Sequence, residues 1–174
     1  RVALVARLGD ELFGRQAAEA LQREGLDTSP LVRDPEAPSG VALIMVSPEG
    51  ENSIVVAPGA NAALTAADVA RAEAAIARAD ALLVQLEVPL PAVRQALALA
   101  RRHGVRAILN PAPALPLPDE LLAEADLLTP NQHEAALLAG CPAEPAALAR
   151  ALLARGVRAL AMTLGRQGAL ISEA

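Results

Sequence analysis

Short apolar runs alternate with amphipathic segments over the last hundred residues of the chain. The apolar runs of strand length are 81–86, 105–109, 127–129, 159–164 and 169–172. The segments with helical spacing are 90–103, 119–124, 131–139 and 146–155. Strands that alternate with helices indicate βαβ units and a mostly parallel sheet. We therefore predict an α/β fold, with a Rossmann-like parallel sheet flanked by helices.

The first part of the chain follows a different pattern. Val2–Leu8 is an apolar run that predicts a buried strand, and Glu11–Glu24 has the apolar spacing of a helix. A further helix is predicted over 65–79, with Thr65 as its N-cap and Asp68 at its third position. The length favours one domain over residues 1–174, or most of one.

Residues 39–46 and 53–57 predict a hairpin joined by the loop 47–52, so that a small β lid spans about 39–57. Its two faces are both apolar. One carries Ala42, Ile44 and Val46, and the other carries Val41, Leu43 and Met45. A surface hairpin normally keeps one polar face, so we expect cover on both sides. The hairpin either packs inside the domain or forms a lid, with one face on a ligand and the other on a partner chain.

Composition and charge exclude several classes of function. The net charge is −5, and no arginine cluster with interleaved aromatic residues is present, so nucleic-acid binding is not expected. The single Cys141 rules out a disulfide within the chain and fits a reducing, cytoplasmic compartment. No apolar run reaches about 18 residues, so no membrane span is expected. The abrupt start at Arg1 and the end after a strand-like stretch indicate an excerpt of a longer protein.

Polar residues follow four of the predicted strands, where open α/β sheets bind ligands. Glu87 is suited to sugar hydroxyls, since a carboxylate accepts up to four hydrogen bonds, or it is an exposed loop acid. Asn110 lines the same crevice or is a turn residue before proline. The glycines of Thr163–Gly168 leave backbone amides open to phosphate, or they form a turn between two strands.

The segment LLTPNQHEAALL (127–138) also has two interpretations. Asn131 is a good N-cap, and Glu134 lies where a capping-box acid reaches back to the cap. A helix N-terminus also attracts phosphate, and a carboxylate there suits phosphate only when a cation intervenes. The pair therefore also suggests hydrated Mg²⁺, which Glu134 contacts through water. His103 and His133 show no metal-ligand spacing and are expected to be structural or exposed.

Several motifs together resemble the ribokinase-type family of carbohydrate kinases, in the right order and over nearly all of the chain. They are SGVALIMVSPEGENSIVVAPGANAAL, LLVQLEVPL, ILNPAPA, LPLPDELLAEADLLTPNQHEA and MTLGRQGA. The stretch from GENS to NAAL, the QLE and the NPAPA are the most specific of these. TPNQHE and TLGRQG match patterns shared across the wider family.

The resemblance implies ATP-dependent phosphorylation of D-ribose at its 5-hydroxyl. It implies that Glu87 binds ribose hydroxyls and that the lid contacts the sugar through Ala42, Ile44 and Val56. It implies that Asn131 contacts ATP phosphates and that Glu134 helps to position Mg²⁺. The residues that would line the nucleotide site are Thr163, Leu164, Gly165, Arg166, Gln167 and Gly168. The outer face of the hairpin would pair with a second subunit in a homodimer.

Two family motifs are missing from the chain. One is the N-terminal sugar-binding motif (GGKGAN-like), and the other is the C-terminal GAGD-like motif with the catalytic Asp and the nearby monovalent-cation site for K⁺. No catalytic base is therefore assigned here, and the isolated segment is expected to be inactive. A kinase for fructose, a deoxy-sugar acid or a nucleoside remains an alternative, as does a non-catalytic fragment that binds nucleotide or dimerises.

Overall fold

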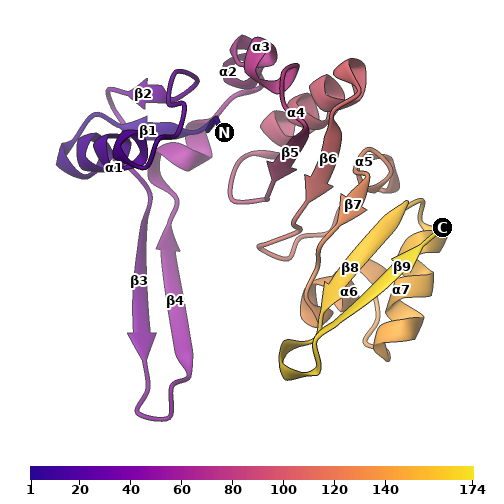
Figure 1. Ribbon diagram of the computed structural model, residues 1–174. Helices are drawn as coiled ribbons and strands as arrows, with labels where there is room; N and C mark the ends of the chain where they lie inside the picture. The colour runs from indigo at the N-terminus through magenta and orange to yellow at the C-terminus, as the bar shows by residue number, and fades with distance from the viewer.

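Figure 1 shows the computed structural model, which describes all 174 residues. The strands are β1 (Arg7–Gly9), β2 (Val32–Asp34), β3 (Val41–Val46), β4 (Asn52–Ala57), β5 (Ala81–Val84), β6 (Arg106–Leu109), β7 (Leu127–Leu128), β8 (Ala159–Thr163) and β9 (Ala169–Glu173). The α-helices are α1 (Leu12–Arg23), α2 (Ala66–Arg71), α3 (Glu73–Ile76), α4 (Leu90–His103), α5 (Asp119–Leu122), α6 (Gln132–Ala139) and α7 (Pro145–Ala154). Two 3₁₀ helices are η1 (Gly59–Ala63) and η2 (Gly165–Gln167).

The C-terminal part is built on one five-stranded sheet in the order β5-β6-β7-β8-β9. Neighbouring strands from β5 to β8 run parallel, and β9 pairs antiparallel with β8. Helices connect successive parallel strands, as the alternation of apolar runs and amphipathic segments predicts. The predicted α/β fold with a mostly parallel sheet is confirmed.

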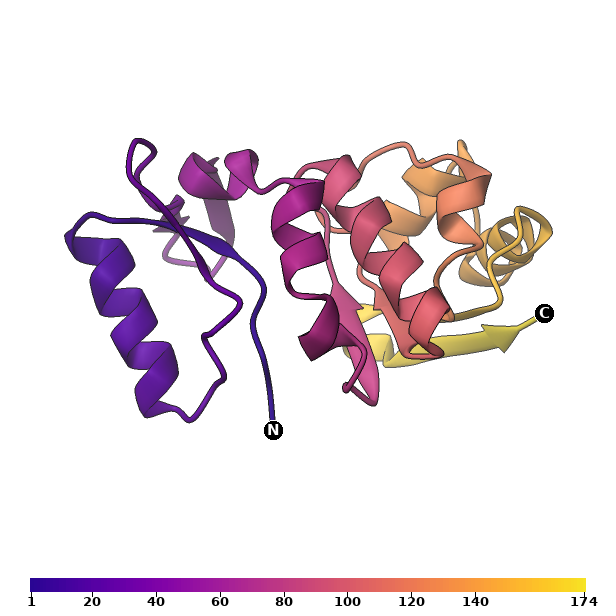
Figure 2. The ribbon, with the colours of Figure 1, turned by 90° about the horizontal axis from the view of Figure 1, so that it is seen from above.

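One face of this sheet carries the main hydrophobic core. Helices α4 to α7 pack on that face, where Leu109, Leu128 and Leu160 are fully buried. Figure 2 shows the helices of this part on one side of the sheet. On the opposite face, Leu83 and Ile171 are each 74% exposed. The core therefore comes from alternate strand residues that meet the apolar faces of the helices.

Helix α4 follows its local sequence closely. Pro91 lies in its first turn, and Gly104 ends it in the left-handed conformation (φ 67°). This is the usual arrangement of proline near the start and glycine past the end of a helix. The predicted bounds 90–103 are confirmed. With 14 residues, α4 is the longest helix, and none of the helices combines the length and hydropathy needed to cross a membrane.

The N-terminal part forms a separate small parallel sheet of β1 and β2. The strand predicted at Val2–Leu8 is shorter, because its only partner in a ladder is the three-residue β2. Upstream of β1, the chain makes only an isolated bridge between Ala3 and Asp27. The strand β2, which contains the charged Arg33 and Asp34, was not predicted because it has no apolar run.

The helix predicted over 65–79 is two helices. Thr65 and Asp68 form the expected capping box at the start of α2. Ala72 then leaves helical geometry (ψ 6°), and α3 begins at the next residue. Val69 and Ile76 from the two halves both pack into a cluster with α4. Alanine is a strong helix former, so this break is a tertiary effect that local propensity did not indicate.

The predicted hairpin forms, with β3 and β4 paired antiparallel and Ala42 opposite Val56. Every residue of both strands is exposed. Packing of the hairpin inside the domain, one of the two expected arrangements, is therefore wrong for this chain. The hairpin projects from the N-terminal part toward the end of the molecule at which strands β5 to β8 also end (Figure 1).

A buried charge network joins the N-terminal part to α2. Arg7 on β1 donates to Asp34 on β2 (2.7 Å) and to Asp68 on α2 (3.2 Å). Both carboxylates are buried, and Asp68 also pairs with Arg71. Hydrogen bonds from the backbone amides of Ala37 and Glu36, followed by that from Arg7, lower the pKa of Asp34 to about 2. The network fixes the part that carries the hairpin against the helical layer.

Candidate functional site

The loops that follow β5, β6, β7 and β8 lie side by side at one end of the sheet. The backbone links them in sequence: Asn110 donates to Val84 O (2.9 Å), and Thr129 donates to Leu109 O (2.9 Å). The Thr163 amide continues the series by donating to Pro130 O (2.9 Å). Parallel strands place their carboxyl ends together, so four segments distant in sequence lie next to one another. We call these four strand-end loops, which begin after β5, β6, β7 and β8, the row.

Glu87 opens this row, just beyond the edge strand β5. Its side chain is exposed, and its backbone amide donates a hydrogen bond to Gln85 Oε1 within the same turn. The neighbouring Leu86 is buried and donates its amide to Ala112 O (2.9 Å). The turn therefore has a fixed backbone and presents an unengaged carboxylate, which is an arrangement suited to hydroxyl groups.

Asn110 lies next in the row, after β6. Its Oδ1 accepts from the Ala112 amide (3.1 Å), which is the local turn bond expected of an asparagine before proline. The turn interpretation of Asn110 is confirmed. The residue is also exposed at the same end of the sheet as Glu87.

Asn131 and Glu134 form a complete capping box at the start of α6. The Glu134 amide donates to Asn131 Oδ1 (2.8 Å), and the Asn131 amide donates to Glu134 Oε2 (2.7 Å). The Asn131 side-chain nitrogen also donates to Glu134 Oε1 (2.7 Å). Glu134 is buried at 8% exposure, whereas Asn131 is exposed. The capping interpretation is confirmed, and the pair lies at the positive end of α6, within the row.

Thr163–Gly168 closes the row as a tight turn between β8 and β9. The Leu164 amide donates to Gly168 O (2.8 Å), and the Gly168 amide donates to Gly165 O (3.1 Å). Both glycines have positive φ, 57° and 88°, and a Cβ added to either would meet no atom within 4 Å. The turn interpretation is confirmed, and its surface is uncovered. Leu164 is half-buried, and Thr163, Arg166 and Gln167 are exposed.

The hairpin groups its predicted ligand contacts on a single face. Ala42 lies opposite Val56, and Ile44 lies opposite Ile54, so these four side chains share one side of the ribbon. Ile44 and Val56 are 61% and 54% exposed. The other face carries Leu43 and Val55, which are paired in the same way and equally exposed.

A family model described as pfkB family carbohydrate kinase matches residues 1–174. The chain belongs to the pfkB family of carbohydrate kinases. It is similar to the ribokinase of Staphylococcus aureus, with 44% identity over 94% of this chain and 55% of that protein. It is also similar to the ribokinase of Haemophilus influenzae, with 39% identity over 99% of this chain and 58% of that protein.

Solved structures give the same picture. The structure of Arabidopsis thaliana ribokinase complexed with ribose and ATP has a TM-score of 0.85 and 27% identity, over 98% of this chain and 57% of that one. The fold of this pfkB-family chain is therefore that of the ribokinases. The chain spans somewhat more than half the length of the relatives it matches.

The pfkB-family chain offers few side chains to a metal ion. No group of three or more His, Cys, Asp or Glu side chains converges anywhere in it. His103 instead pairs with Glu73 (2.8 Å), and His133 is exposed. At the N-terminus of α6 the row offers one carboxylate, that of Glu134, and both of its oxygens accept from Asn131. This donor set fits Mg²⁺ held mainly by water and phosphate and does not fit a protein-made metal cage.

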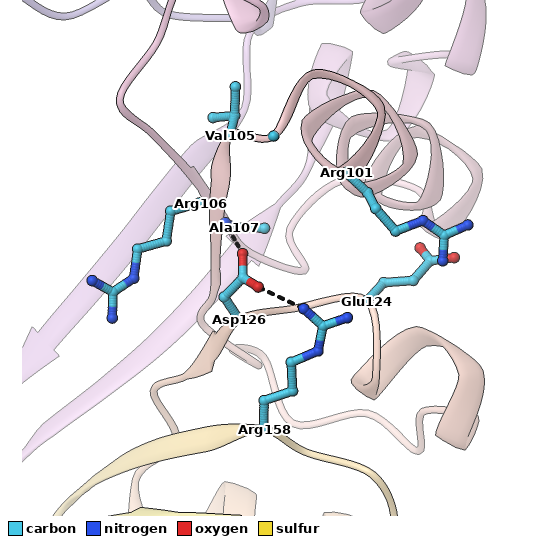
Figure 3. Close-up of a pocket in the computed structure, with 8 residues that line it drawn as sticks. Arg101, Val105, Arg106, Ala107, Glu124, Asp126 and Arg158 are labelled. Atoms are coloured by element: carbon cyan, nitrogen blue, oxygen red, sulfur yellow. Dashed lines mark hydrogen bonds and ion pairs between the residues drawn. The ribbon is translucent and has the colours of Figure 1, made fainter.

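A pocket of about 430 Å³ in the pfkB-family chain lies at the other end of the sheet. Figure 3 shows Arg101, Arg106 and Arg158 around it, with Glu124 and Asp126. Asp126 accepts from Arg158 (2.8 Å) and from the Ala107 amide (2.8 Å). The arginines compensate these acids and the negative end of α4, so the charges balance locally. This pocket is not part of the row.

One polar cluster at the base of the hairpin had no counterpart in the sequence-based expectations. Glu11 and Ser39 meet at the base of the hairpin, where Ser39 donates its amide to Glu11 Oε1 (3.2 Å). The sequence GDELFG had indicated only a turn followed by a helix. The available signal was the glycine at each end of that stretch, since both glycines prove to be buried against neighbouring backbone.

Proposed function

We propose that the full-length protein transfers a phosphoryl group from ATP to the 5-hydroxyl of D-ribose. The observation that carries this proposal is the order of the candidate residues along the row. Glu87 lies at the β5 edge, nearest the part that bears the hairpin, and Thr163–Gly168 lies at the β8 end. The N-terminus of α6 lies between them. A sugar at one end and a nucleotide at the other would bring the transferred phosphate to that helix N-terminus.

At the sugar end, we assign Glu87 to the ribose hydroxyls. Its exposed carboxylate on a fixed turn provides acceptors for two neighbouring hydroxyl groups. The hairpin face with Ala42, Ile44 and Val56 would cover the carbon skeleton of the sugar and exclude water from it.

At the phosphate end, we assign Asn131 and the first turn of α6 to the ATP phosphates. Thr163, Leu164, Gly165, Arg166, Gln167 and Gly168 would line the nucleotide. Glu134 would hold water on Mg²⁺, whose charge offsets that of the phosphates during transfer. No residue of this chain is assigned as the base that activates the hydroxyl. A K⁺ ion is proposed for the full-length protein, with no ligand in these residues.

We assign the second face of the hairpin to a second copy of the chain. Leu43, Met45 and Val55 are exposed on a strand pair that covers nothing in its own chain. A contiguous exposed apolar face of this kind is typical of a protein interface. Sedimentation of the full-length protein is expected to show a homodimer, and a monomer at all concentrations would contradict the assignment.

A coupled assay of the full-length protein tests the reaction. We expect ATP-dependent phosphorylation of ribose in preference to 2-deoxyribose, fructose and nucleosides. Glu87→Ala is expected to raise the KM for ribose by tenfold or more, since each hydrogen bond to a charged group contributes about 1.5–3 kcal/mol. The KM for ATP should stay within about twofold, because Glu87 lies at the opposite end of the row.

The matched control is Glu120→Ala, which removes an exposed carboxylate from α5, outside the row. Both kinetic constants of this variant should equal those of the wild type. A higher turnover with fructose or a nucleoside than with ribose would replace the proposed substrate. An unchanged ribose KM in Glu87→Ala would remove Glu87 from the sugar site.

A further inference from the structure

The orientation of the hairpin depends on the two chain segments that connect it to the rest of the molecule. All residues of β3 and β4 are exposed, so the hairpin has no packed surface of its own in this chain. The chain enters through Ser39 and Gly40 and leaves through Pro58 and Gly59. Whatever holds these two segments in place also sets the angle of the lid.

The two segments cross in close contact. A Cβ on Gly40 would lie 2.7 Å from Pro58 O, and a Cβ on Gly59 would lie 2.4 Å from Pro38 O. The Ala60 amide donates to Pro38 O (2.8 Å), and Ala60 itself is fully buried. The crossing therefore moves as one unit, and a single anchor on the entering segment is enough to hold both.

Glu11 and Ser39 provide that anchor. The Ser39 amide and the Gly14 amide both donate to Glu11 Oε1, at 3.2 and 3.0 Å. The Ser39 hydroxyl accepts from the Gly9 amide at 3.0 Å. Ser39 and Gly9 are buried. The entering segment is thus bonded on one side to the end of β1 and on the other to the first turn of α1.

The identity of Glu11 is informative, because helix N-caps normally carry Ser, Thr, Asp or Asn. A shorter cap residue would serve Gly14 equally well. The longer glutamate reaches from the helix start to Ser39, and it does so although its Oε2 is buried without a hydrogen-bond partner. Gly9 makes room for it, since a Cβ on Gly9 would lie 2.0 Å from that oxygen, and Gly14 makes room for Ser39, since a Cβ there would lie 2.7 Å from Ser39 Oγ.

We propose that Glu11 is a positioning residue that clamps the base of the lid through Ser39 and so sets the angle at which the hairpin closes over the sugar site. The role of the lid in sugar binding rests on the proposed function. The clamp itself does not, since it concerns the orientation of the hairpin in the protein without any ligand.

The test compares Glu11→Ala, Glu11→Gln and the control Glu19→Ala in the full-length protein. Glu19 is an exposed glutamate on the same helix. Spin labels on Glu51→Cys in the hairpin loop and on the native Cys141 report the lid orientation by pulsed electron resonance. We expect a broader distance distribution for Glu11→Ala and wild-type widths for Glu11→Gln, whose amide oxygen still accepts both bonds, and for Glu19→Ala.

Two further readouts separate positioning from general destabilisation. In Glu11→Ala, hydrogen exchange at the Ser39 and Gly14 amides should be about tenfold faster, as expected for the loss of one hydrogen bond to a charged group. The KM for the sugar should rise while the KM for ATP stays unchanged. Ser39→Ala, which removes the acceptor for Gly9, serves as a second variant if Glu11→Ala fails to fold, and it should broaden the distribution too.

An unchanged distance distribution in Glu11→Ala, or in Ser39→Ala where that variant replaces it, overturns the clamp. Equal broadening in Glu19→Ala overturns it as well. Because the distance measurement uses no substrate, the clamp can hold even if the protein fails to phosphorylate ribose, and failure of the clamp leaves the ribose assay unaffected.

Discussion

The hairpin strands β3 and β4 and the central strands β6 and β8 are built from similar residues, mainly Val, Leu, Ile and Ala. In the central strands, alternate side chains such as Leu109 and Leu160 are fully buried under helices. In the hairpin, Ile44 and Val55 are both more than half exposed. An apolar strand pattern therefore predicts that a face will be covered, but it does not say whether the same chain supplies the cover.

The difference separates two kinds of contribution to the protein. Burial of the central strands stabilises the fold through the hydrophobic effect and close packing. The hairpin side chains are not covered by any other part of the chain. The free energy gained by burying their apolar surface is therefore available for binding a sugar or a second subunit. Mutations in the two regions should therefore affect different measurements.

The largest expected effect contrasts Leu160→Ala in β8 with Ile44→Ala in β3. Leu160 is fully buried, so its truncation should lower the free energy of unfolding by about 2–5 kcal/mol. Ile44→Ala should change it by less than about 0.5 kcal/mol at matched protein concentration and should instead raise the KM for the sugar. Urea denaturation and steady-state kinetics measure the two quantities. If Ile44→Ala loses as much stability as Leu160→Ala, the hairpin contributes to folding, and the proposed difference between the two regions is contradicted.

A smaller effect is expected at the junction between the two regions, at Asp34. Its pKa is about 2 in the folded protein, below the ordinary 3.8, so ionised Asp34 contributes stability that is fully present above pH 3.8. That contribution is lost as the pH falls toward 2. Asp34→Asn should therefore have a lower free energy of unfolding than the wild type at pH 7. This difference between the two proteins should shrink below pH 4.

Urea unfolding at pH 7, 4 and 3 measures this trend. Asp80→Asn changes an exposed carboxylate and is the matched control. Its free energy of unfolding should equal that of the wild type at each pH. A difference in the free energy of unfolding between Asp34→Asn and the wild type that is constant from pH 7 to pH 3 would show that the hydrogen bonds from Ala37, Glu36 and Arg7 do not stabilise ionised Asp34 as the structure indicates.

The smallest expected effect on stability is at Asn131, where the sheet region meets the proposed ligand. Asn131→Ala removes the N-cap of α6 and should lower the free energy of unfolding by about 1 kcal/mol. Asn131→Ser retains a good N-cap and should restore most of that stability. Both variants are expected to bind ATP more weakly, as measured by titration calorimetry. If Asn131→Ser binds ATP with wild-type affinity, Asn131 caps the helix but does not contribute to ATP binding.

Much of the fold followed from short-range features of the sequence. Helix α4 begins and ends where its proline, apolar spacing and glycine predict, and the capping boxes at Thr65 and Asn131 form as expected. These features involve residues within one helical turn of each other, so the local sequence contains all of the groups that take part. The row of candidate residues was also predictable, because parallel strands place their carboxyl ends together.

The features that were missed connect residues far apart in the chain. Arg7 reaches Asp34 and Asp68 across 27 and 61 positions, and Glu11 reaches Ser39 across 28. The break at Ala72 and the exposure of the hairpin likewise depend on what packs against each segment. The sequence by itself determined most of the secondary structure, the caps of its helices and the chemistry available at the strand ends. Only the tertiary structure decided which apolar faces are covered and how the lid is anchored, because both depend on contacts that no local pattern specifies.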